Sequence, residues 1–209
     1  GISVRIGADI WFKSILAVIG LSGTWATTLV VIAVGFGIVW WERRKRGGIV
    51  PVHGDFLGWM LVESLSYAVL MPIVATVVMA PVLFSTFPTA MFAPQAEFDL
   101  LTELTLSLGA GLYEELLFRV VLVTGLFWLF RTLTKGEKRL SYVLAAVIGA
   151  FVFSAVHYIG AYGDPLQLTS FVYRFLLGLL LNALYLLRGF GVAAWTHAFY
   201  DVLVVTDIL

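Results

Sequence analysis

Long apolar stretches separated by short polar breaks run along the whole chain. The breaks carry charged and turn-forming residues, as in ERRKRGG (42–48), RTLTKGEKR (131–139) and GAYGDP (160–165). Each apolar stretch has about 20 residues or more, the length at which a helix crosses a bilayer. The stretches are 14–41, 57–84, 110–131, 140–159, 166–187 and 190–209. This pattern predicts an all-α, polytopic transmembrane helical bundle of about six spans.

Composition strengthens the membrane interpretation. Hydrophobic residues make up 61% of the 209 residues, and charged residues only 12%, against roughly 25% in ordinary soluble domains. No polar linker is long enough to divide the chain. We therefore expect one integral membrane domain over residues 1–209, with N-terminal spans within 14–84 and a core at 98–209 that carries the motifs described below.

Positive charge predicts the orientation of the spans. Lys and Arg cluster in the loops at 42–48 and 131–139, and two spans separate these loops, so both lie on one side of the membrane. The positive-inside rule makes that side cytoplasmic. The breaks at 85–99 and 160–165 carry acidic residues and no Lys or Arg, which suits the outer side. We expect a multi-pass protein of the cell membrane, and the short chain favours a prokaryotic one.

The segment FDLLTELTLSLG (98–109) is too polar for a span. Its leucines follow helical spacing, and Asp99 and Glu103 lie on the opposite side. This pattern is typical of an amphipathic helix at the membrane interface. We expect Gly109 and Gly111 to end this helix before the next span begins.

Three formal charges stand inside the apolar sequence at LYEELLFR (112–119). A charge at the bilayer centre costs about 2.5–3.5 kcal/mol on insertion scales. Glu115 and Arg119 are four residues apart and can pair along one helix. Glu114 lies about 140° around the helix from Arg119, so it remains without a local partner. Unpaired ionisable groups within spans are functional candidates.

Two of the three histidines also lie in predicted spans, His157 in FVFSAVHY and His197 in AAWTHAFYD. His157 follows Phe153 by four residues, and His197 precedes Asp201 by four, so each pair shares a helix face. A single such histidine is usually a packed core residue. Two histidines and an unpaired Glu114 on separate spans instead favour proton-transfer chemistry, because imidazole exchanges a proton near neutral pH and a desolvated carboxylate becomes a better base.

These residues resemble three motifs of one membrane-protein family. EELLFR resembles E-E-x-x-x-R, FSAVH resembles F-x-x-x-H, and HAFYD resembles H-x-x-x-N/D of the CAAX protease and bacteriocin-processing family, also called the abortive-infection family. All occur in the family's order, within residues 114–201. The resemblance implies a glutamate-dependent intramembrane protease without a metal or other cofactor. Its implied partners are a protein or peptide substrate with a membrane-associated segment and the lipid bilayer, with no nucleic acid.

The resemblance also implies roles for the matching residues. Glu114 and His157 would activate a water molecule, and His197 with Asp201 would stabilise the oxyanion. Glu115, Arg119 and Phe153 would support them. Because an ionised aspartate cannot donate to an oxyanion, we interpret Asp201 as the group that orients His197 and favours its charged form. The bond hydrolysed would lie near the C-terminus or the membrane anchor of the substrate.

Three alternatives remain open at this point. The chain could be a catalytically silent scaffold or immunity protein of the same fold. One glutamate and two histidines could instead form the zinc site of a metalloprotease, although no H-E-x-x-H motif occurs. Glu and His within spans could also relay protons in a transporter, although no inverted repeat is evident.

Further polar residues fall within spans. We expect Glu63 and Arg174 to pair with each other, the alternative being that Arg174 binds a substrate carboxylate. Asn182 is expected to make a hydrogen bond between helices.

Overall fold

The computed structural model describes residues 54–83, 100–159 and 164–209, together with scattered positions between Leu29 and Gly47. These residues divide between two compact units, Gly1–Trp59 and Met60–Leu209. All of the candidate site residues belong to the second unit. The single domain predicted over the whole chain stays a prediction.

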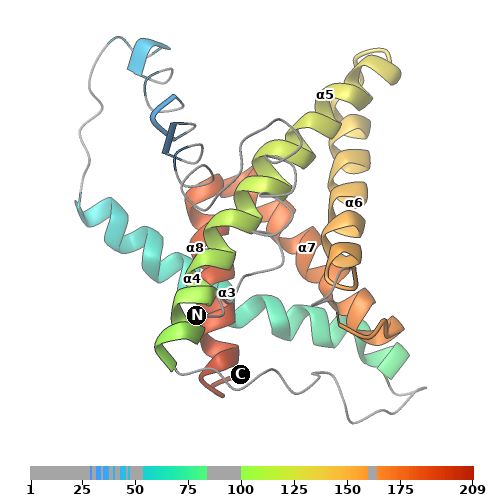
Figure 1. Ribbon diagram of the computed structural model, residues 1–209. Coiled ribbons are helices and arrows are strands. Elements are labelled where there is room, and N and C mark those ends of the chain that lie inside the picture. Colours follow the sequence, from blue (N-terminus) through green and yellow to red (C-terminus); the bar gives the residue numbers. More distant parts are fainter. Residues whose placement is uncertain are drawn as a thin grey trace. The chain divides into compact units, whose positions relative to one another are not determined.

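Helices make up almost all of the described chain and no strand occurs within it, which confirms the all-α prediction (Figure 1). The elements are α3 (Gly54–Leu83), α4 (Leu100–Glu115), the π-helical segment η1 (Leu116–Val123), α5 (Thr124–Leu133), α6 (Lys138–Val156), α7 (Leu168–Arg188) and α8 (Phe190–Val205).

Four helical runs are long and apolar enough to cross a membrane: Gly54–Pro81, Glu103–Leu133, Lys138–Val156 and Leu168–Arg188. The last predicted span corresponds to α8, which is apolar but has only 16 residues. Most of the first predicted span, 14–41, lies outside the described residues, as does the whole polar break at 85–99. The protein is therefore an integral membrane protein with several spans, and the number six stays a prediction.

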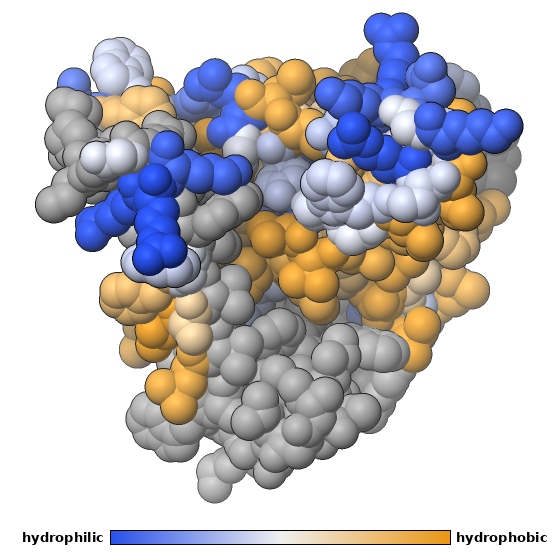
Figure 2. Space-filling view, turned by 90° about the horizontal axis from the view of Figure 1, so that it is seen from above, coloured by the Kyte–Doolittle hydropathy of each residue, from blue (hydrophilic) through white to orange (hydrophobic). Residues whose placement is uncertain are grey.

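The surface of the described helices is largely apolar (Figure 2). Large hydrophobic side chains on α3, α5 and α6 are strongly exposed, among them Val77, Trp128 and Phe151. Such exposure would be unfavourable in water but is expected of helices that face lipid.

The predicted break at Gly109 and Gly111 is wrong, because α4, η1 and α5 form one uninterrupted helical run (Figure 1). Glycine is tolerated inside this helix because neighbouring helices pack against it. A Cβ at Gly111 would lie only 2.5 Å from the Cβ of Ala198 and 2.6 Å from the carbonyl oxygen of Ala194. Gly111 thus lets α4 approach α8 closely. The interfacial location of residues 98–109 stays a prediction.

Small and polar residues join α6 to α7. Gly178 of α7 packs directly on Ala150 and Phe153 of α6. The side-chain amide of Asn182 donates to the carbonyl of Ala146 over 2.8 Å, which confirms the predicted hydrogen bond between helices. Ser154 Oγ donates to the carbonyl of Phe171 over 2.7 Å. Close backbone contact of this kind is the usual way in which membrane helices associate.

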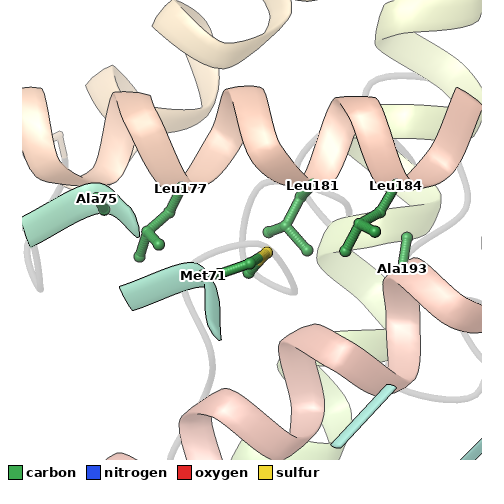
Figure 3. Packing of buried hydrophobic residues seen from close by; sticks show 6 residues of the cluster. All are labelled: Met71, Ala75, Leu177, Leu181, Leu184 and Ala193. Atoms are coloured by element: carbon green, nitrogen blue, oxygen red, sulfur yellow. The ribbon is translucent and has the colours of Figure 1, made fainter. Parts of the chain in front are cut away.

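A compact apolar cluster joins α3, α7 and α8 (Figure 3). Leu177, Leu181 and Leu184 follow one face of α7 and point toward Met71 of α3 and Ala193 of α8. Since α7 also contacts α6, this cluster holds α6 and α8 in a defined relation to each other. These two helices carry the two histidines of the site.

Candidate active site

Four helical segments, two of them consecutive in one continuous run, bring the candidate residues together. Glu114 and Glu115 end α4, directly before the π-helical segment η1, which contains Arg119. His157 caps the C-terminus of α6, and His197 lies within α8. Short π-helical segments are rare and are frequent at functional sites. Here η1 begins at the residue that follows the two glutamates.

Glu115 forms the buried centre of the site. Its Oε1 lies 2.9 Å from NH1 of Arg119, and both side chains are completely buried. The predicted pairing along the helix is therefore confirmed. The same Oε1 accepts a hydrogen bond from Nδ1 of His197 over 2.8 Å. One carboxylate oxygen thus connects α4, η1 and α8.

Glu114 lies between the two histidines. Its Oε2 is 3.9 Å from Nε2 of His157 and 3.9 Å from Nε2 of His197. The Glu114 side chain is only 8% exposed. It makes no ion pair with Arg119 in the described part of the chain, as the helical geometry predicted. Its carboxylate faces two imidazole nitrogens from two other helices.

The hydrogen bonds of the two rings define their orientations. Nδ1 of His157 donates to the backbone carbonyl of Phe153 over 2.7 Å. In the neutral ring Nε2 is then an acceptor, and it faces Glu114. Nδ1 of His197 is bound to Glu115, and its Nε2 lies 3.6 Å from Oδ2 of Asp201. Carboxylates thus face His197 at both ring nitrogens, an arrangement that favours a proton on each of them.

Phe153 is the aromatic centre of the site. Its ring meets the rings of His157 and His197 at centroid distances of 4.9 and 6.0 Å, both nearly edge-on. The guanidinium carbon of Arg119 lies 4.5 Å from the same ring centroid. Phe153 therefore orients both imidazoles and covers the buried cation by a cation–π contact.

The predicted pairing of Glu63 with Arg174 is wrong. Glu63 forms a two-point pair with Arg188 instead, with Nε–Oε1 and NH2–Oε2 distances of 2.6 Å each. Arg174 pairs with Asp164 in the segment that precedes α7. These partners are far apart in sequence or separated by a turn. Their pairing depends on which helix faces meet.

Sequence reasoning missed two features of the site. It assigned Glu115 to Arg119 alone, whereas the same oxygen also binds His197. It counted Asp164 only as a negative charge in an outer loop, whereas the Asp164–Arg174 pair adjoins His157, whose carbonyl accepts the backbone N–H of Asp164 over 2.9 Å. The sequence feature that could have indicated a partner for Asp164 is that it is the only charged residue of the break at 160–165.

The described residues include no group of three or more His, Asp or Glu side chains arranged to hold a metal ion. The zinc alternative therefore has no set of ligands with suitable geometry within this part of the chain.

The apolar helices define an integral membrane protein, and its buried centre combines carboxylates and imidazoles from three helical segments. A family model described as type II CAAX prenyl endopeptidase Rce1-like matches residues 96–203. This match covers more than half of the chain and contains all three motifs. The chain belongs to this family of CAAX-type endopeptidases, as the motifs predicted. Searches of curated proteins and of solved structures gave no significant match.

Proposed function

We propose that the protein is a glutamate-type intramembrane endopeptidase that hydrolyses a peptide bond near the C-terminus or the membrane anchor of its substrate. The observation that carries this proposal is the position of the Glu114 carboxylate, 3.9 Å from the Nε2 atoms of His157 and His197. A buried carboxylate that faces two imidazoles can act as a general base toward a water molecule held between them.

Glu114 and His157 act on the attacking water. Two acceptor atoms 3.9 Å apart can both receive a hydrogen bond from one water molecule, since each such bond is about 2.8 Å long. Glu114 takes a proton as the water oxygen bonds to the carbonyl carbon of the scissile peptide. The proton then passes to the amide nitrogen as the carbon–nitrogen bond breaks. The products are a carboxylic acid and an amine, and no other reactant is consumed.

His197 stabilises the negative oxygen of the tetrahedral intermediate. Its Nδ1 is held by Glu115, so that Nε2 remains as the donor that faces the site. A donor fixed in advance contributes more than one that must reorient during the reaction. Asp201 lies 3.6 Å from Nε2 and acts through His197 by orienting its ring. Glu115, Arg119 and Phe153 are positioning residues in this scheme.

The expected activity can be tested on purified protein in detergent, with a farnesylated peptide ending in Cys-Val-Leu-Ser. We expect release of Val-Leu-Ser, detected by mass spectrometry, and the same rate after treatment with a strong chelator. Activity lost on chelation and restored by zinc would contradict the metal-independent mechanism. The peptidase proposal would be contradicted by two results together: no cleavage of this peptide, and identical membrane proteomes in cells that express the wild type or Glu114→Gln. These results would favour the silent scaffold.

The site faces the outer side of the membrane in this proposal. The basic residues Arg131, Lys135, Lys138 and Arg139 lie at one end of α6. His157 directly follows the other end, 19 residues along the helix, or about 28 Å at 1.5 Å per residue. That length is nearly the full hydrocarbon thickness. If the loops at 42–48 and 131–139 are cytoplasmic, His157 and its neighbours lie near the outer surface.

Cysteine labelling tests this orientation directly, because the chain contains no cysteine. Lys135 and Gln167 are both exposed and flank α6 on its two sides. We expect Gln167→Cys to react with an impermeant thiol reagent in intact cells, and Lys135→Cys to react only after permeabilisation. The reverse pattern would place the site toward the cytoplasm.

A further inference from the structure

Arg174 is a cation beside the site, and only some of its hydrogen-bond donors have a partner in the described chain. Its NH2 pairs with Oδ2 of Asp164. Its NH1 is buried and has no hydrogen-bond partner among the described residues. The guanidinium carbon lies 5.2 Å from the ring centroid of Tyr158, whose hydroxyl is fixed by a 2.7 Å contact with Ser170 Oγ. The cation is therefore held in place with one donor edge incompletely bound.

The other ion pair of this kind in the described chain provides a comparison. Arg188 binds Glu63 at two points, through Nε and NH2, each over 2.6 Å. Such a fork is the arrangement in which a guanidinium binds a carboxylate most strongly. Asp164 occupies only one nitrogen of Arg174. The Asp164 side chain is 42% exposed, so its carboxylate can turn into solvent and release the guanidinium.

The position of this pair relates it to the reaction. The backbone N–H of Asp164 donates to the carbonyl of His157 over 2.9 Å, so the pair lies directly beside a residue that flanks Glu114. Arg174 lies on α7, which packs against α6, the helix that His157 caps. Arg119, the other cation near Glu114, is completely buried and bound to Glu115. Of these two described cations, Arg174 is the one that a substrate can reach, because its side chain is 26% exposed.

We propose that Arg174 binds the free C-terminal carboxylate of the substrate, and that Asp164 occupies the guanidinium when no substrate is bound. This inference rests on the proposed function, because it assigns a carboxylate-binding residue to the same site. The contact would add to the affinity for substrates that end close to the bond that is cleaved. Internal segments of membrane proteins carry no such carboxylate and would bind less well.

Binding to a catalytically inactive protein tests the inference without requiring turnover. The probes are two fluorescent farnesylated peptides ending in Cys-Val-Leu-Ser, one with a free carboxylate and one with a C-terminal amide. In the Glu114→Gln background we expect the acid to bind at least about tenfold more tightly than the amide, as for a hydrogen bond to a charged group. Adding Arg174→Gln should make the two probes bind alike. Arg174→Lys, which keeps the charge but not the fork, should show an intermediate preference.

Two further variants provide controls. Arg131→Gln removes a cation outside the site, whose guanidinium carbon lies 5.5 Å from the ring centroid of Trp128. This variant should keep the full preference for the acid. Asp164→Asn should increase the preference, because the probe no longer competes for the guanidinium. Equal binding of acid and amide in the Glu114→Gln background, or an unchanged preference in both Arg174 variants, would overturn the inference. If the acid is preferred in an Arg174-dependent way but the wild-type protein hydrolyses the acid probe no faster than Glu114→Gln does, the result would contradict the peptidase proposal alone.

Discussion

Replacing Glu114 by glutamine should lower kcat for peptide-bond hydrolysis by about 100- to 10,000-fold, the usual contribution of a general base. Glutamine has nearly the same shape and can still accept a hydrogen bond from water through its amide oxygen. It cannot take the proton when the water attacks the carbonyl carbon. Because Glu114 makes no ion pair with Arg119 and its contacts with the histidines are 3.9 Å long, the fold should tolerate the change. The measurement is single-turnover cleavage of the farnesylated peptide.

The matched control is Glu103→Gln, which neutralises a carboxylate on the same helix, α4. Its backbone carbonyl accepts a hydrogen bond from Ser107 Oγ, and this contact survives the substitution. Glu103→Gln should keep the wild-type rate. His157→Ala and His197→Ala should each lose most of the activity while remaining folded. A wild-type rate in Glu114→Gln would show that this carboxylate is not the base.

Arg119→Met should destabilise the protein by about 3–5 kcal/mol, the effect of removing one partner from a buried ion pair. Arg119 and Glu115 are completely buried, so the substitution leaves a carboxylate without its cation. Methionine retains most of the apolar packing against Phe153. The expected result is a large fall in the free energy of unfolding, measured by circular dichroism in detergent micelles.

Two variants separate charge from packing in this experiment. Adding Glu115→Gln to Arg119→Met should restore most of the stability, because the buried charge is gone and the amide oxygen can still accept from Nδ1 of His197. Arg188→Met removes a cation from a pair of good geometry whose arginine side chain is 51% exposed, and should cost no more than about 1 kcal/mol. If Arg119→Met and Arg188→Met lose the same free energy of unfolding, burial of the ion pair does not determine the cost of removing its cation.

The positions of two of the predicted spans agree closely with the structure. The stretches at 57–84 and 166–187 correspond to α3 (Gly54–Leu83) and α7 (Leu168–Arg188). The physical reason is that a helix in lipid satisfies its backbone hydrogen bonds within itself and exposes apolar side chains along its length. The signal is therefore contained in the segment itself and needs no knowledge of its neighbours.

The glycines before the site show where local reasoning fails. In water, Gly109 and Gly111 would favour the end of a helix. The continuous run from α4 to α5 arises because Gly111 fits closely against Ala194 and Ala198 of α8. The loss of helix propensity at Gly111 is offset by the packing of two helices, and that packing depends on a partner about 85 residues further along the chain.

Some ion pairs could likewise be predicted from the sequence, and others could not. The Glu115–Arg119 pair was predicted because residues four apart share a helix face. The Glu63–Arg188 pair joins α3 to the end of α7 and could not be inferred from spacing. The expected Glu63–Arg174 pair was reasonable by charge alone. Which cation a buried carboxylate meets depends on the rotation and depth of each helix, and many weak contacts set these together.

The sequence by itself determined a helical membrane protein, its family, and the few ionisable groups whose presence in apolar segments needs an explanation. Each follows from the energy of placing one segment or one charge in lipid. Only the tertiary structure decided that Glu114 faces both imidazoles, that Glu115 binds Arg119 and His197 with one oxygen, and that Arg174 adjoins His157 through Asp164. These relations join different helices, and their geometry exists only once small residues such as Gly111 and Gly178 have let the helices approach.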